Sequence, residues 1–97
     1  MNDIVKEDQW VYVIVQNTGG NEAFLGQQDV EKNISFIPAF LSSDDAGICL
    51  RHLKKDDSLA YEIHAILYED LLKYASQNGL MVFLLNSSGE ILKKETI

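Results

Sequence analysis

The chain lacks several features that small proteins use for stability or for attachment. It contains a single cysteine, Cys49, and therefore cannot form an internal disulfide, which is typical of proteins in a reducing compartment. No apolar run is long enough to span a bilayer. Residues 1 to 8 do not have the basic start and apolar stretch of a signal peptide. We therefore expect a cytoplasmic protein.

Positive charge is also scarce, since eight Lys and Arg residues stand against fifteen Asp and Glu residues, for a net charge of −7. Nucleic acids and anionic membranes are both recognised by clustered Lys and Arg side chains. We expect neither as a partner, whereas a basic protein or a second copy of the chain stays open. The 97 residues suffice for a single domain over 1–97 with its own core, and we expect residues 1–8 to be frayed.

No motif predicts a catalytic residue, a cofactor site or a metal site, and an enzyme is not favoured. Cys49 shares an apolar helical stripe with Ala46 and Leu53, so we interpret it as a small buried side chain rather than a nucleophile. One cysteine and two histidines cannot supply a zinc site. His64 could titrate as a base, but its strand position is typical of a partly exposed histidine without catalytic work.

Nucleotide binding is disfavoured for a separate reason. Phosphate-binding loops place glycines between a strand and the start of a helix. The two corresponding junctions of this chain, 41–45 and 67–70, carry carboxylates instead, which repel phosphate.

Three segments are apolar on both faces, namely 10–15, 36–41 and 81–85. Because successive side chains of a strand point to opposite faces, each run can be sorted by parity. One parity is rich in aromatics, with Trp10, Tyr12, Phe36, Phe40 and Phe83. The other parity is aliphatic, with Val11, Val13, Val15, Ile37, Leu41, Val82 and Leu84. Such runs indicate a sheet covered on both faces.

The remaining local signals give the order of elements. Strands are predicted over 9–16, 22–26, 35–41, 61–67 and 80–85, with 27–33 as a polar connection. A helix begins after Ser42 or Ser43 and runs to Leu53, and a second begins at Tyr68 and stops at Asn78–Gly79. Pro38 predicts either an edge strand or a position where its missing N–H would have no partner.

The fold class is therefore α/β, of an α+β-like kind, with a mixed five- to six-stranded sheet and two helices. The order is β-β-β-α-β-α-β, with or without a last strand over 91–93. The two strand–helix–strand units predict parallel neighbours joined by right-handed crossovers.

The order of motifs resembles the N-terminal domain of the SseB family, bacterial proteins named for enhanced serine sensitivity. The resemblance covers residues 36–89. It rests on Phe36-Ile37-Pro38-Ala39-Phe40, Ser42-Ser43-Asp44-Asp45-Ala46, Glu69-Asp70-Leu71-Leu72, and the run from Val82 to Asn86 with Gly89. It implies the fold and a bacterial cytoplasmic setting, and it implies no catalytic residue.

Three functions are compatible with the sequence. The first is a non-catalytic protein-interaction module, self-associating or not, whose candidate partner-binding residues are Trp10, Tyr12, Phe36, Phe40 and Phe83. This holds if both helices lie on the aliphatic face. If one helix covers each face, the aromatic residues are core.

The second function is a small-ligand-binding domain or enzyme with a site at the carboxyl ends of the parallel strands. The candidate ligand-binding residues there are Ser42, Ser43, Tyr68 and Asn86. The third is an acidic inhibitor or immunity protein that covers a basic site on its target.

Overall fold

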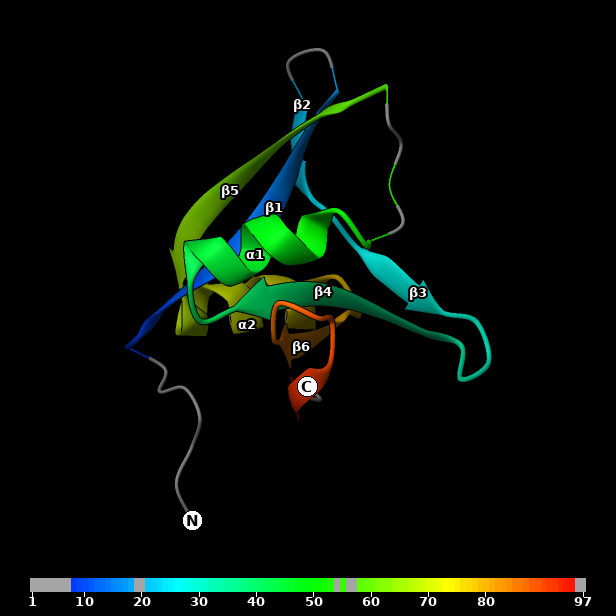
Figure 1. The fold of residues 1–97 in the computed structure, drawn as a ribbon. Coiled ribbons are helices and arrows are strands. Elements are labelled where there is room, and N and C mark those ends of the chain that lie inside the picture. Colours follow the sequence, from blue (N-terminus) through cyan, green and yellow to red (C-terminus); the bar gives the residue numbers. More distant parts are fainter. Residues whose placement is uncertain (1–7, 19–20, 54, 56–57, 96–97) are drawn as a thin grey trace.

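The described residues form a mixed seven-stranded sheet with one helix on each face, an α+β fold (Figure 1). The computed structural model describes residues 8–18, 21–53, 55 and 58–95. The predicted mixed sheet with two helices is confirmed, although the sheet has one or two strands more than expected. Fraying was predicted for residues 1–8, and of these residues 1–7 lie outside the described part of the chain.

The elements follow the predicted order with one addition. They are β1 (Trp10–Thr18), β2 (Asn21–Phe24), β3 (Gln27–Asp29), β4 (Ile34–Phe40), α1 (Ser43–Leu50), β5 (Ala60–Leu67), α2 (Tyr68–Gln77), β6 (Met81–Leu85) and β7 (Ile91–Glu95). The addition is β3, which was expected to be a connection. That expectation was wrong because β3 is held by backbone pairing with β4, while its side chains are polar and give no apolar alternation.

β1 lies at the centre of the sheet and decides its topology. It pairs antiparallel with β5 along eight residues, and on its other side with β2 and β4. β4 then pairs parallel with β6, and β6 antiparallel with β7. The expectation that each strand–helix–strand unit joins adjacent strands was wrong, because β1 separates β5 from both β4 and β6.

The strands β1 and β4 diverge from a short common stretch, as Figure 1 shows. They pair only at Tyr12 with Phe40 and at Val13 with Ala39. Beyond that point β2 continues beside β1 and β3 beside β4. Pro38 lies where β4 passes from β3 to β1, and it has a register partner only in β6. A residue without an N–H is therefore tolerated inside the sheet.

The two faces separate by parity as predicted. On the face that α2 covers, the buried core is aliphatic with one tyrosine: Val11, Val13, Val15, Ile37, Ala39, Tyr68, Leu71, Ala75, Val82 and Leu84. On the face that α1 covers, the buried core contains Ile14, Leu25, Phe40, Ala46, Cys49, Phe83 and Leu85. These two faces are called the α2 face and the α1 face below.

Local chemistry sets the helix ends. Ser42 is the N-cap of α1, and its Oγ accepts a hydrogen bond from the Asp45 N–H at 3.1 Å. Helix α1 ends at Leu50, three residues before the predicted end, because His52 N–H already bonds the Cys49 carbonyl in a tighter turn. Gly79 has a φ of +66° and closes α2, where Leu80 N–H donates to the Ala75 carbonyl at 2.9 Å.

Candidate functional site

Helix α1 is too short to cover the whole of its face. Its eight residues pack on β1, β4 and β5. The part of the α1 face formed by β3, β4, β6 and β7 carries a hollow instead, which is called the Phe36 groove below. Its volume is about 450 Å³. It is lined by Gln27, Gln28, Asp29, Val30, Glu31, Phe36, Leu53, Phe83, Leu85, Gly89 and Ile91.

The floor of the Phe36 groove is aromatic and rigid. The rings of Phe36 and Phe83 stack with centroids 4.2 Å apart and planes 17° from parallel. Phe83 is almost fully buried, whereas Phe36 is half-buried and forms the accessible part of the stack. The stack joins two hydrogen-bonded strands, since Phe36 is on β4 and Phe83 is on β6.

The walls of the Phe36 groove are apolar side chains that water reaches. Val30 is 76% exposed in the turn between β3 and β4, and Ile91 is 46% exposed at the start of β7. Leu53, just after α1, is half-buried at the third side. Large exposed apolar side chains gathered around one hollow are typical of a binding surface.

The described charged residues of the Phe36 groove have one sign. Among the described residues that line it, Asp29 and Glu31 are charged, and none is a Lys or Arg. Asp29 also accepts a hydrogen bond through Oδ1 from the Lys32 N–H at 3.4 Å, which shapes the turn. An apolar floor with an acidic rim favours an apolar group flanked by positive charge.

The predicted partner-binding residues do not form one patch. Phe40 and Phe83 are buried, because α1 packs on this face and α2 on the other. Tyr12 is half-buried against the same core. Trp10 is 56% exposed at the start of β1, and Phe36 lies in the groove. The structure thus has the arrangement in which one helix covers each face, and it leaves Trp10 and Phe36 accessible at separate places.

The predicted ligand-binding residues are engaged in local structure. Ser42 caps α1, and Tyr68 is buried in the core of the α2 face. The Asn86 side chain accepts hydrogen bonds from Ser88 N–H and Glu90 N–H at 3.0 and 2.9 Å, which fixes the β6–β7 turn. Ser43 lines a different hollow beside α1. No described hollow brings these four residues together.

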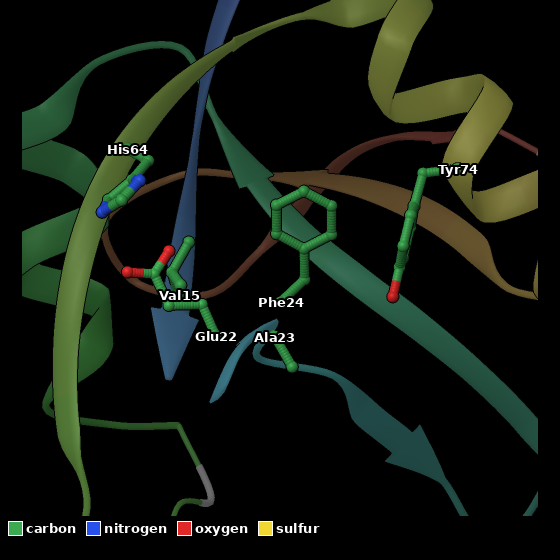
Figure 2. Close-up of a pocket in the computed structure, with 6 residues that line it drawn as sticks. All are labelled: Val15, Glu22, Ala23, Phe24, His64 and Tyr74. Carbon is green, nitrogen blue, oxygen red and sulfur yellow. The ribbon is translucent and has the colours of Figure 1, made fainter. Parts of the chain in front are cut away.

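A second hollow lies on the α2 face, between Tyr74 of α2 and residues of β1, β2 and β5. It is called the His64 cleft, has a volume of about 270 Å³, and is shown in Figure 2. Its lining residues are Val15, Glu22, Ala23, Phe24, His64 and Tyr74. Phe24 and Tyr74 meet edge to face with centroids 4.7 Å apart. Val15 stands between Phe24 and Glu62 in the register of the sheet.

His64, which lines the cleft, pairs with a carboxylate that does not line it. His64 Nε2 lies 2.9 Å from Glu62 Oε2, and both side chains are well exposed. An exposed pair of this kind contributes little to stability. Among the described residues that line the cleft, none is a serine, threonine, cysteine or lysine that His64 could activate as a nucleophile. Aromatic rings beside Glu22 are better suited to binding a cation.

Cys49 lies inside the protein, as the sequence predicts. Cys49 is buried, and this burial raises the pKa of its thiol above the ordinary value of 9.0. Its Sγ lies 3.7 Å from the position that a Cβ would take at Gly89.

Within the described ranges no three His, Cys, Asp or Glu side chains gather as metal ligands. None of the described helices is long and apolar enough to cross a membrane.

Comparisons with models of known protein families, with curated proteins and with solved structures find no match for this chain. The resemblance to the SseB family therefore stays a prediction.

Sequence reasoning missed most of the Phe36 groove. Val30 and Leu53 come from two connections and Ile91 from the start of β7, far apart in the chain, and only the fold gathers them. Val30 gave one usable signal, because it is an isolated large apolar residue inside the polar stretch 27–33. Such a residue in a turn is either buried or available for binding, and here it is exposed.

Proposed function

We propose that this protein is a non-catalytic, cytoplasmic protein-interaction module whose Phe36 groove binds an apolar side chain in a basic segment of a partner protein. The observation that carries the proposal is the stacked Phe36–Phe83 floor between the exposed walls Val30 and Ile91. An apolar side chain placed there covers Val30, Ile91 and the accessible part of the Phe36 ring, and so removes all three from water.

The charge of the groove supports a basic segment rather than an acidic one. Asp29 and Glu31 stand at the rim, and the chain as a whole carries a net charge of −7. A partner with Lys or Arg beside its apolar anchor gains attraction at the rim and faster encounter in solution. A segment with acidic flanks is repelled by the rim carboxylates and by the net negative charge of the chain.

The proposal is tested with labelled peptides and fluorescence polarisation. The first probe alternates leucine and lysine, and the second alternates leucine and glutamate at the same length. The Leu/Lys peptide is expected to bind with an affinity that falls as salt is added, because the rim charges are exposed. The Leu/Glu peptide is expected not to bind. Equal binding of both peptides, or of neither, would contradict the proposal.

β7 offers a matched pair of variants that locates the binding. Ile91 and Leu92 are neighbours with similar exposure, 46% and 42%, but Ile91 lines the groove and Leu92 does not. We expect Ile91→Ser to weaken Leu/Lys binding about tenfold and Leu92→Ser to leave it unchanged, since truncating an interface anchor costs roughly 1–2 kcal/mol. An equal effect of both substitutions would place the peptide outside the groove.

A small-ligand function is the second candidate, and the His64 cleft rather than the carboxyl ends of β4 and β6 supports it. The Phe24–Tyr74 pair and the nearby Glu22 suit a small organic amine. A thermal-shift screen of diamines and quaternary amines tests this idea. It predicts a rise in melting temperature that Tyr74→Leu abolishes; a screen in which no amine raises the melting temperature would reject it.

We also propose membership of the SseB family on the residues quoted above. The matching segment, 36–89, contains β4 from Phe36 onward, both helices, β5, β6 and the turn after it. A bacterial cytoplasmic setting follows from that membership and is part of the proposal.

A further inference from the structure

The outer edge of β5 is open in the described part of the chain. All eight residues of β5 pair with β1 on one side, from Ala60 opposite Asn17 to Leu67 opposite Trp10. No described strand pairs on the other side. Figure 1 shows β5 as the long olive strand at this border of the sheet. The backbone N–H and C=O groups along such an edge form a template for another strand.

Two of the usual protections of an edge strand, a β-bulge and a proline, are absent from β5. Its register with β1 runs without a bulge, and it contains no proline. Its carboxylate and its imidazole, Glu62 and His64, lie on the α2 face and contact each other. The opposite edge strand, β7, carries Lys93, Lys94 and Glu95 in five residues. β5 is therefore less guarded than β7.

A hollow runs along this edge between α1 and β5, with a volume of about 550 Å³. It is lined by Ser43, Asp44, Gly47, Ile48 and Arg51 of the α1 region and by Ile63 of β5. Ile48 is 48% exposed at its centre. At Gly47 the helix lies against the strand, since a Cβ at this residue would make an ordinary contact with Ile63 Cδ1 at 3.6 Å. The α1–β5 surface, as these six residues are called here, has an apolar middle.

The charges of the α1–β5 surface stand at its two ends. Asp44 is in the first turn of α1, and Arg51 is the C-cap, seven residues and roughly 10 Å further along the helix axis. No ion pair within the described ranges involves either side chain. The surface is thus acidic at one end, apolar in the middle and basic at the other end.

We propose that the α1–β5 surface binds a second copy of this chain in a two-fold symmetric dimer. A two-fold axis perpendicular to the sheet at β5 makes the two β5 strands antiparallel and keeps both α1 helices on the same face. It also reverses one helix relative to the other. Asp44 of each copy then faces Arg51 of the other, and Ile48 of each copy faces the small Gly47 of the other.

A second copy fits this surface better than an unrelated partner because the surface complements itself. An isologous interface requires that each feature meets its complement after a two-fold rotation. The acid–apolar–base order of Asp44, Ile48 and Arg51 meets that requirement, and antiparallel edge pairing meets it as well. The net charge of −7 opposes association through long-range repulsion, so the dimer is measured at about 0.15 M salt, where this repulsion is screened.

The test is sedimentation velocity on the full chain over a range of concentrations, with charge reversal at the two ends. The wild type is expected to dimerise in a concentration-dependent way. Asp44→Arg and Arg51→Asp each place like charges opposite each other, and each is expected to weaken dimerisation about tenfold or more. The double variant Asp44→Arg/Arg51→Asp restores opposite charges across the axis and is expected to recover dimerisation.

Recovery in the double variant separates the proposed contact from damage to α1. Asp44→Arg also weakens the favourable charge at the helix start, so circular dichroism is recorded for each variant. Ile48→Lys is expected to abolish the dimer, whereas Leu92→Lys, at a similarly exposed apolar residue, is expected to leave it intact. A monomer at high micromolar concentration, or a double variant no better than the single variants, would overturn the proposal.

Hydrogen exchange locates the contact independently. At concentrations where the dimer forms, the amides of β5 are expected to gain protection and those of β7 are not. Protection confined to β7 or to the β3–β4 turn would assign the dimer to another surface and reject this one. The Phe36 groove lies on other strands, so Ile91→Ser is expected to leave the dimer unchanged, and failure of one proposal leaves the other open.

Discussion

Phe36 on β4 stacks on Phe83 on β6 with ring centroids 4.2 Å apart, and the two strands that carry them are parallel neighbours. One ring is buried and the other is half-buried. The stack is therefore both the end of the core on the α1 face and the floor of the Phe36 groove. The same two rings therefore contribute to the stability of the fold and to the proposed binding surface.

The first prediction concerns this pair. Phe83→Ala is expected to cost about 3–5 kcal/mol of unfolding free energy, as for other buried phenylalanines. Phe36→Ala should cost less, because Phe36 already contacts water. The double variant should show a coupling of about 0.5–1.5 kcal/mol from the stacked rings. Urea denaturation of the four proteins measures all three values, and strictly additive losses would show that the stacking itself contributes nothing.

Trp10 provides the second prediction. It is 56% exposed, so its fluorescence emission in the free chain is expected at the long wavelength of a wet indole. Trp10→Ala should cost about 1 kcal/mol, well below the cost of emptying a core position. Phe40→Ala is the control, because Phe40 is fully buried on the same face and its loss should cost about 3–5 kcal/mol. Comparable losses in the two variants would mean that Trp10 is a core residue.

Ser42 provides the third prediction. Its Oγ accepts the Asp45 N–H and so satisfies one of the free donors at the start of α1. Ser42→Ala is expected to cost about 1 kcal/mol of unfolding free energy, the usual loss for an N-cap. Ser43→Ala, one residue later, should change stability little. The reverse order of the two losses would move the cap to Ser43, which the sequence had left open.

Cys49 provides the fourth prediction, a pH dependence. Burial raises the pKa of its thiol above the ordinary value of 9.0, so the folded chain holds this proton more tightly than the unfolded chain. The stabilisation by the neutral thiol is complete below pH 9 and is lost as the pH rises through the folded-state pKa.

The measurement compares the wild type with Cys49→Ala by urea denaturation between pH 7 and pH 10. The free energy of unfolding of the wild type should fall relative to that of the variant only above about pH 9. A thiol reagent such as Ellman's reagent should also react slowly with the folded chain at pH 8. Rapid reaction under native conditions would show that the thiol is accessible.

Much of the fold could be predicted from the sequence because the signals were local. The alternation from Trp10 to Val15 assigned those side chains to two faces, and the structure keeps both assignments. Asp44, Asp45 and the preceding serines marked the start of α1, and Asn78–Gly79 marked the end of α2. Each signal depends on neighbours within a few residues, whose geometry the backbone fixes.

The candidate sites depended on contacts that no local pattern records. The placement of β1 between β4 and β5, the divergence of β1 from β4, and the open edge of β5 all follow from which strands pair. Pairing joins residues far apart in the chain, and several registers satisfy the same alternation of apolar side chains. The sequence by itself determined the elements and their buried faces, whereas the tertiary structure alone decided that Phe36 meets Ile91 around one groove and that Ile63 meets Gly47 at an edge with no described neighbour beyond it.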